Sequence, residues 1–458
     1  MYNLMAGAYR VRRMNHDLSA RVCVIGAGSS GIAAVKNLLQ AGLRNIIVYE
    51  KNEAIGGNWL YSPHLSHSSV YETTHIISSK MLSQFDDYPM PTDYPDYPSH
   101  KQILAYFESY AQHFGVMEYI RFNTEAASAQ KQPDETWQIT LIDGTVEVFD
   151  YLIVANGHHW DPRMPNYSGE FTGEMLHSHA FKSAELFRDQ RVLVIGGGNS
   201  ACDIAVETSR ISAFTAISLR RGYYIVPKFT MGQPTDVMAS KFKWLPRPLY
   251  KAALKLSLWM NIGDYRDYGL ERPKHGLLEA HVTMNSELLY YVRHGKIHPR
   301  RDIARFEGHT VHFVDGKTED YDVVICATGF NISFPFFDKS FLDFTEGKDV
   351  PLYLLTFHPD HPSLFFVGLV QPLGSIWPLS DLQSKLTANT IIGNYTPPAD
   401  IRERIAHDLD YRQRNYVKSP RHSVEVEYFP FRSKLLREMP ANAPKWGERA
   451  REQEVVTV

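Results

Sequence analysis

Two glycine-rich turns in this sequence have the spacing of dinucleotide-binding loops. The first, GAGSSG from Gly26, matches G-x-G-x-x-G, and the second, GGGNSA from Gly196, matches G-x-G-x-x-A. Such loops lack side chains where the backbone must approach a pyrophosphate, and the helix that follows offers free amide groups to the anion. We therefore predict two dinucleotide sites. The residues expected to bind cofactor phosphates are Gly26, Gly28, Ser30, Gly31, Gly196, Gly198, Asn199, Ser200 and Ala201.

The residues at the end of the next strand differ between the two copies. In the first copy the strand NIIVYE ends at Glu50, which Lys51 follows. A carboxylate at this place accepts hydrogen bonds from ribose hydroxyls and repels a 2′-phosphate. In the second copy Arg220 and Arg221 take this place, and a guanidinium can bind a 2′-phosphate through a forked, charge-assisted pair. We predict a ribose site without a 2′-phosphate at Glu50 and Lys51, and an NADP-type site at the two arginines.

The elements that must position these turns are repeated as well. The β-branched runs before the turns, 22–25 and 192–195, are typical of buried parallel strands. The segments DYLIVANG, 150–157, and DVVICATG, 322–329, are near-copies of each other, and each follows an Asp-Gly hairpin signal. The repeats predict two α/β units of the same build.

The order of these repeats indicates that one unit is inserted into the other. The expected fold class is α/β, with two nested doubly wound, Rossmann-like domains. The first domain is expected to take residues 1–163, to be interrupted by an inserted domain over 164–328, and to resume over 329–458 with the C-terminal tail. Pro162 and Pro165 mark the first crossing, and the apolar run 364–370 is expected to return to the first sheet.

Composition narrows the class of protein. The chain has 458 residues, 44% of them hydrophobic, and a net charge of −3, which gives no pull toward nucleic acid. Its three cysteines form no C-x-x-C pair, which is typical of a reducing compartment, and no apolar run is long enough to cross a membrane. We expect a cytoplasmic protein with no stable membrane anchor. We expect no metal, because His158-His159 and His177-x-His179 lack further ligands at zinc-like spacing.

Longer motifs point to a family. The segment FTGEMLHSHAF, with Phe171, Gly173, His177 and Phe181, fits F-x-G-x-x-x-H-x-x-x-(F/Y). The other motifs are GGNW at 56–59, HVTMNSEL at 281–288, ATGF at 327–330 and QPLGSIWPLSDLQ at 371–383. Together, from residue 21 to residue 383, the chain resembles the flavin-containing monooxygenases, class B flavoproteins similar to dimethylaniline monooxygenase.

The resemblance implies a chemistry and its cofactors. It implies FAD in the first domain and NADPH in the second, with a hydride passing from NADPH to the flavin. The reduced flavin then captures O₂ as a C4a-hydroperoxide, and a soft nucleophilic nitrogen or sulfur takes the distal oxygen. The implied partners are O₂ and a small amine or thioether. The resemblance also allows a homodimer, since family members often dimerise.

The resemblance also assigns roles to single residues. It places Gly57, Asn58, Trp59 and Thr328 against the cofactors, and His177 where it supports NADP binding. It brings the C-terminal motif with Gln383 close to the isoalloxazine, as a catalytic and cofactor-binding residue. The family usually carries an Asn near the reactive edge of the flavin, where this chain has Ile77, Ser78 and Ser79. Ser78 is therefore expected to act there as the catalytic hydrogen-bonding group in place of the amide.

Two other activities and one structural question stay open. A Baeyer–Villiger enzyme would oxygenate ketones, but that group usually has Trp where this chain has Phe181. A non-oxygenating NADPH-dependent flavoprotein reductase of the disulfide type needs a redox-active cysteine pair, which the spacing of Cys23, Cys202 and Cys326 does not provide. The lysines and prolines of the stretch 238–268 favour an excursion that covers the mouth of the active site, with contact to a membrane as the alternative.

Overall fold

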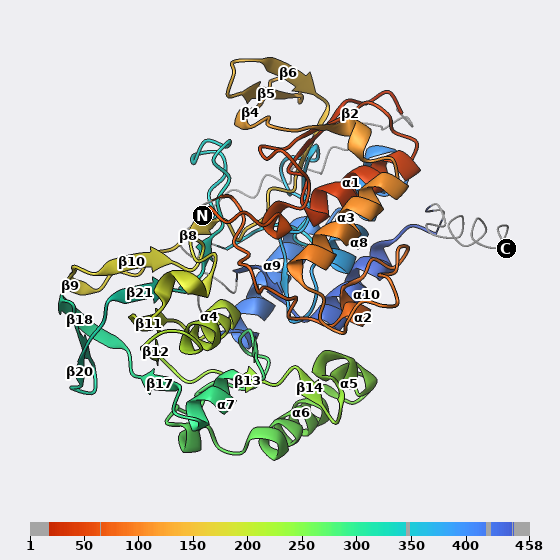
Figure 1. Cartoon of the computed structure of the whole chain (residues 1–458). Coiled ribbons are helices and arrows are strands. Elements are labelled where there is room, and N and C mark those ends of the chain that lie inside the picture. The colour runs from red at the N-terminus through yellow and green to blue at the C-terminus, as the bar shows by residue number, and fades with distance from the viewer. Residues whose placement is uncertain (1–17, 65, 345–348, 418–422, 442, 444–458) are drawn as a thin grey trace, which may run out of the picture.

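Two parallel β-sheets lie at the centre of the computed structural model, which describes residues 18–64, 66–344, 349–417, 423–441 and 443 (Figure 1). Their strand orders are β23-β7-β1-β2-β3 and β10-β21-β11-β12-β17. The first sheet consists of β1 (Val22–Ile25), β2 (Ile46–Tyr49), β3 (Ile120–Arg121), β7 (Tyr151–Val154) and β23 (Leu364–Phe366). The second consists of β10 (Glu174–His177), β11 (Arg191–Ile195), β12 (Phe214–Ser218), β17 (Ile297–Arg300) and β21 (Val323–Cys326).

The two sheets are built in the same way. β7-β1-β2-β3 in the first corresponds to β21-β11-β12-β17 in the second, and all these neighbours pair in parallel. Asp150 and Asp322, at matching places in the two repeats, make the same hydrogen bond to the backbone. The Asp150 carboxylate accepts from the Arg21 amide at 2.9 Å, and the Asp322 carboxylate accepts from the Arg191 amide at 2.8 Å. The prediction of two nested doubly wound domains is confirmed.

Smaller strands extend each domain. The predicted hairpins at Asp143-Gly144 and Asp315-Gly316 are present, and both glycines have the positive φ that such turns require. The first hairpin belongs to a sheet of β4 (Ala126–Lys131), β5 (Trp137–Leu141) and β6 (Val146–Phe149). The second belongs to a sheet of β9 (Ser168–Phe171), β18 (Ile303–Gly308), β19 (Thr310–Phe313) and β20 (Thr318–Asp320). Short pairs are β13 (Ile225–Val226) with β16 (Thr283–Met284), β14 (Phe229–Thr230) with β15 (Gln233–Pro234), and β24 (Gln371–Pro372) with β25 (Glu425–Val426).

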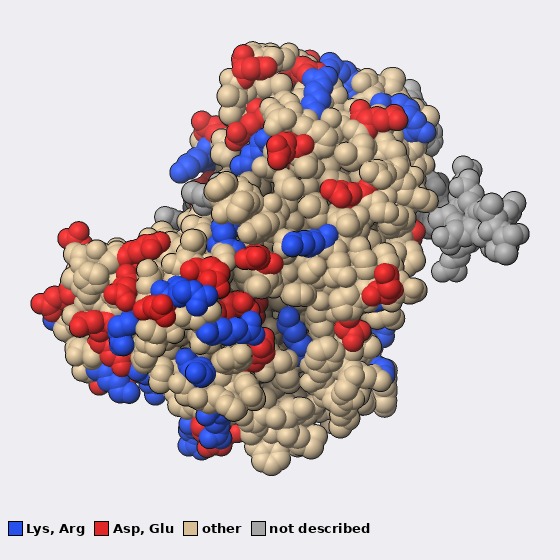
Figure 2. All heavy atoms as spheres, in the orientation of Figure 1, with Lys and Arg blue, Asp and Glu red and all other residues tan. Residues whose placement is uncertain are grey.

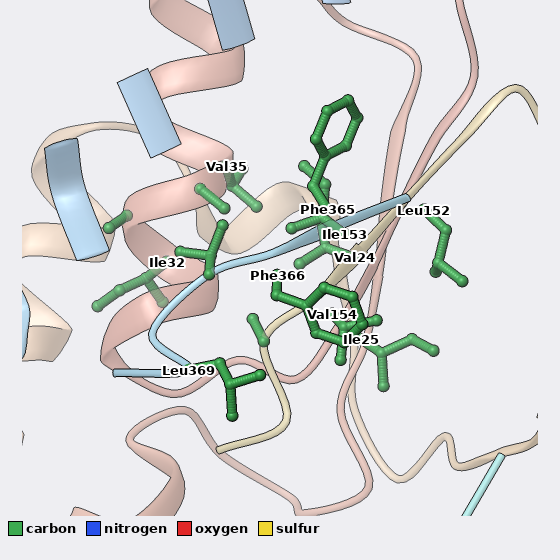
Figure 3. Close-up of a cluster of buried hydrophobic side chains, with 14 of the residues drawn as sticks. Val24, Ile25, Ile32, Val35, Leu152, Ile153, Val154, Phe365, Phe366 and Leu369 are labelled. Carbon is green, nitrogen blue, oxygen red and sulfur yellow. The ribbon is translucent and has the colours of Figure 1, made fainter. Parts of the chain in front are cut away.

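Helices cover the sheets and close the core. All fifteen residues of α8 are buried, and this helix packs along α1. Figure 3 shows α1 lying beside the strands of the first sheet, with Ile32 and Val35 on the side of the helix next to Val24, Ile153 and Phe366. The helices are α1 (Ser29–Gln40), α2 (Lys80–Ser83), α3 (His100–His113), α4 (Asn199–Ser209), α5 (Thr235–Lys241), α6 (Arg247–Ile262), α7 (Leu288–Arg293), α8 (Trp377–Ile391), α9 (Ile401–Asn415) and α10 (Tyr428–Glu438), with 3₁₀ turns η1 (Gly57–Trp59), η2 (Met117–Tyr119), η3 (Ala184–Phe187) and η4 (Tyr265–Tyr268).

The chain crosses between the domains twice, and the two crossings lie side by side. The outgoing strand β8 (Asp161–Pro162) pairs antiparallel with the returning strand β22 (Phe330–Asn331). The predicted boundaries, after residues 163 and 328, fall next to these strands. The apolar run that follows supplies β23, which pairs with β7 of the first sheet as predicted.

Candidate active site

One cavity of about 1300 Å³ reaches from the first glycine turn to the second. It opens along the carboxyl ends of β1 and β11, where ligands bind in doubly wound sheets. Of the predicted site residues, the cavity is lined by Gly26, Gly28, Ser30, Glu50, Lys51, Gly57, Asn58, Trp59, Ser78, Gly196, Gly198, Asn199, Ser200, Ala201, Arg220, Arg221 and Thr328. Both turns therefore face the same space.

The first turn is shaped by close backbone contacts. Gly26 has a φ of +102°, and an added Cβ would lie 2.6 Å from the Ala155 carbonyl oxygen. At Gly31 an added Cβ would collide with the carbonyl of Gly26, so Gly31 brings helix and strand together without itself lining the cavity. α1 begins after Gly28 with no side-chain cap, whereas α3 begins with a capping box of Ser99 and Gln102. The first amides of α1 are thus open to an anion.

Glu50 fits the ribose role. The carboxylate is buried at the cavity wall, where one oxygen accepts from the Ala27 amide at 2.7 Å. The other oxygen accepts from the amide and the side chain of Asn52 at 2.9 and 2.7 Å. A carboxylate has about four acceptor positions, so capacity for a ribose hydroxyl remains. These donors also orient the carboxylate before any ligand arrives.

The second turn has the same geometry and an additional brace. Gly196 has a φ of +132°, and α4 begins after Gly198 without a side-chain cap. The Thr283 hydroxyl donates to the Gly197 carbonyl at 2.6 Å, and the Asn199 side chain accepts from the Met284 amide at 2.7 Å. The predicted HVTMNSEL segment therefore fixes the shape of this turn.

Two arginines line the cavity beside the second glycine turn, where the sequence predicts a site for a 2′-phosphate. Arg220 is exposed at the cavity wall, and no hydrogen bond or ion pair joins it to another residue in the described part of the chain. Arg221 lies over the Tyr223 ring at 5.4 Å, and its buried Nε has no hydrogen-bond partner in the described part of the chain. Unpaired guanidinium groups beside a glycine turn fit a phosphate. The residues present therefore suit an NADP-type ligand here and a flavin dinucleotide at Glu50.

The remaining lining residues close the flavin end of the cavity. The Asn58 side chain accepts from the Ser69 amide at 2.7 Å, and Trp59 packs edge-on against Trp377 with ring centres 5.6 Å apart. Lys51 lies over the Trp160 ring at 5.1 Å. Ser78 lines the cavity, and its hydroxyl lies 2.8 Å from that of Ser83. The structure thus places Ser78 at the cavity wall, and its role at the flavin edge stays a prediction.

Gln383 does not reach the cavity, and the prediction of a direct cofactor contact needs correction. Its side chain is fully buried, accepts from the Gly368 amide at 3.0 Å and donates to the Leu354 carbonyl at 3.1 Å. Gly368 lines the cavity, and an added Cβ there would collide with the Ser30 side chain. The polar atoms of the Gln383 side chain are therefore hydrogen-bonded to backbone groups, and they stabilise the cavity wall at Gly368 from the protein interior.

His177 likewise lies behind the wall, at the junction of the two domains. Its Nε2 donates to the Gly329 carbonyl at 3.0 Å, and its Nδ1 accepts from the His179 amide at 3.1 Å. This arrangement satisfies the neutral ring, and burial lowers the pKa of His177 to about 4. His177 thus lies at the domain junction, outside the cavity lining, and supports the ATGF segment, whose Thr328 hydroxyl donates to the Arg163 carbonyl at 2.5 Å. Its support of NADP binding stays a prediction.

A polar link between the domains escaped the sequence analysis. The Tyr71 hydroxyl of the first domain donates to one Asp203 oxygen at 3.2 Å, and the Asn285 side chain donates to the other at 2.6 Å. Burial raises the pKa of Asp203, which lies on α4 and lines the cavity with Tyr71. The available signal was Asp203 within the apolar run 201–206 of α4, but its partner Tyr71 lies 132 positions away.

We expect Arg220→Ala to weaken NADPH binding roughly tenfold to a hundredfold, because one charge-assisted phosphate contact contributes about 1.5–3 kcal/mol. NADH binding should change little, since NADH has no 2′-phosphate. Titration of both coenzymes measures the effect, with Arg305→Ala, an exposed arginine paired with Glu307, as the control. Equal losses for the two coenzymes would show that Arg220 supports the fold instead.

We expect His177→Gln to reduce the loss of stability in mild acid. Folding lowers the pKa of His177 from 6.5 to about 4, so the unfolded chain binds more protons between these values. The stabilisation is complete above about pH 6.5 and is lost as the pH falls toward 4. The measurement is the unfolding temperature at neutral pH and in mild acid, with the exposed His407→Gln as the control. An unchanged pH dependence in His177→Gln would contradict this role.

Comparisons with known proteins identify the family of this chain. A family model described as flavin-binding monooxygenase-like matches residues 19–444. Flavin-containing monooxygenase 5 of Rattus norvegicus is 35% identical over 432 residues, which cover 89% of this chain and 80% of that protein. The N-oxide-forming dimethylaniline monooxygenase 2 of the same organism is 32% identical over 452 residues, covering 92% and 83%.

Solved structures share the fold. The S-allyl-L-cysteine S-oxygenase of Allium sativum superimposes with a TM-score of 0.69 at 24% identity, covering 95% of this chain and 92% of that one. An oxidised steroid monooxygenase bound to NADP gives a TM-score of 0.70 at 17% identity, covering 91% and 97%. From the family match and the two curated relatives, the chain belongs to the flavin-binding monooxygenase-like family and is a flavin-containing monooxygenase with FAD and NADPH as its cofactors.

Proposed function

We propose that this enzyme uses NADPH and O₂ to oxygenate a soft nucleophilic nitrogen or sulfur of a small molecule. The observation that carries the proposal is the single cavity that joins the two glycine turns, with Glu50 at one ribose position and Arg220 and Arg221 at the other. A shared cavity allows the two cofactors to come into contact. The negative charge of Glu50 and the positive charges of Arg220 and Arg221 assign one dinucleotide to each turn.

The chain's own residues bind and orient the cofactors and exclude water. When bound, FAD that has been reduced by NADPH supplies the capacity to activate O₂. Gly26 and Gly28 hold the flavin dinucleotide, while Arg220 and Arg221 hold the second one. Burial lowers the pKa of His67 to about 3 and also lowers the pKa of His158, so these two rings at the cavity wall are neutral near pH 7. They offer no acidic proton to the reacting oxygen.

The three cysteines argue against a disulfide reductase. Cys23, Cys202 and Cys326 are free and buried, on β1, α4 and β21. Burial raises the pKa of all three thiols, whereas a redox-active cysteine needs a lowered one. An oxygenase is therefore favoured over a flavoprotein reductase that works through a cysteine pair.

Nitrogen or sulfur is favoured over ketones by Phe181 and by two of the relatives. Phe181, where ketone-oxygenating enzymes usually carry Trp, is buried between Tyr71 at 5.4 Å and Phe187 at 5.7 Å between ring centres. It fills the core of the second domain and lies away from the cavity lining. One relative is named for N-oxide formation and one structural neighbour for S-oxygenation. We infer an amine or thioether as the substrate.

The proposal is tested by product identification. The purified enzyme is given NADPH and O₂ with matched amines, thioethers and ketones, and the products are identified by mass spectrometry with ¹⁸O₂. We expect an N-oxide or a sulfoxide that carries one labelled oxygen. Esters or lactones from the ketones, with no amine or thioether product, would instead establish the Baeyer–Villiger activity.

We expect Ser78 to control how tightly NADPH oxidation is coupled to substrate oxygenation. A serine hydroxyl is shorter than an Asn amide and offers one donor in place of two. Ser78→Asn should therefore slow the release of hydrogen peroxide from the NADPH-reduced enzyme without substrate, and Ser78→Ala should speed this release severalfold. A peroxide assay measures this, with the half-buried Ser128→Ala on β4 as the control. If both Ser78 variants leak like the parent, its hydroxyl does not act on the flavin edge.

A further inference from the structure

The peptide group between Ser78 and Ser79 is hydrogen-bonded at both of its ends. Its N–H donates to the Asp236 carboxylate at 2.6 Å, and its carbonyl accepts from the Ser83 hydroxyl at 3.4 Å. Because a peptide group is planar, these two bonds fix the plane in which the backbone leaves Ser78. The Ser78 hydroxyl lies 2.8 Å from the hydroxyl of Ser83, which is fully buried. The orientation of Ser78 at the cavity wall therefore depends on side chains that do not line the cavity themselves.

One of these side chains belongs to the other domain. Asp236 is the second residue of α5 in the inserted domain, whereas Ser78 and Ser79 belong to the first domain. α5 packs against α2, the four-residue helix that begins directly after Ser79. A carboxylate that accepts from a backbone amide forms a short, charge-assisted hydrogen bond. Asp236 thus links the inserted domain to the backbone beside Ser78.

The Asp236 carboxylate has few other partners. Its second oxygen accepts from the amide of Val237, its own neighbour, at 2.8 Å. No cation forms an ion pair with Asp236 in the described part of the chain, and Figure 2 shows few charged atoms over the lower edge of the molecule, where α5 lies. Burial raises the pKa of this carboxyl group. The Ser79 amide is therefore a main stabilising partner of a charge that burial disfavours.

The loop that carries Asp236 is braced from both domains. The Thr235 amide donates to the Lys228 carbonyl at 2.9 Å, and the Thr235 hydroxyl donates to the Pro227 carbonyl at 2.7 Å. The Tyr97 hydroxyl of the first domain donates to the same Lys228 carbonyl at 2.6 Å. These bonds fix the start of α5 and with it the position of the carboxylate.

The same loop leads back to the second glycine turn. It follows β13 directly, and β13 pairs in parallel with β16. The Thr283 hydroxyl of β16 donates to the Gly197 carbonyl in that turn at 2.6 Å. Direct contacts therefore connect the turn of the NADPH-binding domain with the backbone at Ser79.

The chain after α5 is also held against the first domain. Lys243, between α5 and α6, lies over the Phe429 ring at 4.9 Å. Arg247, at the start of α6, forms an ion pair with Glu427 at 2.5 Å and donates to the Asn415 side chain at 3.2 Å. Neither these two helices nor any other in the described residues is long and apolar enough to span a bilayer. Contacts on both sides of α5 thus keep this helix against α2.

We propose that Asp236 is a positioning residue for the flavin edge of the cavity. Its carboxylate holds the Ser79 amide and thereby keeps the Ser78 hydroxyl in place. Asp236 does not line the cavity, so it acts through Ser78 and not on a cofactor or substrate. The proposal rests on the proposed function, from which it takes the role of Ser78 in peroxide release. It adds that the domain that binds NADPH also positions this hydroxyl.

Hydrogen exchange of the holoenzyme tests the contact itself, without turnover. Asp236→Ala removes the acceptor of the Ser79 amide, whereas Asp236→Asn keeps an oxygen there without the charge. We expect the Ser79 amide to exchange roughly tenfold faster in Asp236→Ala and closer to the parent rate in Asp236→Asn. The matched control is Ser240→Ala, which removes a bond within α5, from the Ser240 hydroxyl to the Val237 carbonyl at 2.7 Å. An unchanged Ser79 amide in Asp236→Ala, or an equal change in the control, overturns the proposal.

Peroxide release tests whether Asp236 acts through Ser78. Without substrate, Asp236→Ala should speed the release of hydrogen peroxide from the NADPH-reduced enzyme severalfold, and Asp236→Asn should speed it less. In the Ser78→Ala background Asp236→Ala should add nothing, because the two changes remove the same interaction. Retained flavin absorbance shows that each variant binds FAD.

Two results of this cycle would overturn the role of Asp236. One is an equal effect of Asp236→Ala in both backgrounds, which would show a general loss of structure. The other is no effect of Asp236→Ala in the parent. A parent that yields no N-oxide or sulfoxide would contradict the proposed function instead, since the exchange and peroxide measurements use no substrate.

Discussion

The whole site depends on how the two chain crossings are fastened to each other. Arg163 donates from its amide to the Gly329 carbonyl at 3.0 Å and from its guanidinium to the Thr328 carbonyl at 2.8 Å, and His177 donates to the same Gly329 carbonyl. These bonds tie β8 to β22, and they turn the carboxyl ends of both sheets toward one cavity. Without this fastening the two glycine turns would be separate nucleotide sites.

Within that frame, the two halves differ mainly in the charge beside the ribose. Both turns rely on backbone contacts too close for a side chain, and both helices begin without a cap. The Glu50 carboxylate accepts hydrogen bonds from donors of its own domain, whereas the Nε of Arg221 has no acceptor in the described part of the chain. The same fold can thus bind two related dinucleotides selectively, because the charge of the side chain beside the ribose differs between the two domains. The link from Tyr71 to Asp203 then holds the two bound positions against each other.

Local signals in the sequence were enough for the parts of the site that depend on local geometry. The glycine turns, the Asp-Gly hairpins and the repeated strands each follow from a few neighbouring residues, and all are present in the structure. Gln383 and His177 were placed by a motif, and a motif states which residues recur without stating which atoms they touch. Their bonds, to Gly368 and to Gly329, depend on how distant segments pack. Tyr71 with Asp203 could not be found for the same reason.

The central claim is that NADPH at the second turn reduces the flavin at the first turn across one cavity. Anaerobic rapid mixing of the holoenzyme with NADPH, and with NADPH deuterated at the transferred position, tests it most directly. We expect one equivalent of NADPH to remove the visible absorbance of the oxidised flavin without substrate or oxygen, and deuteration to slow this step. A flavin that stays oxidised, or that reduces only when a second protein is added, would contradict the account.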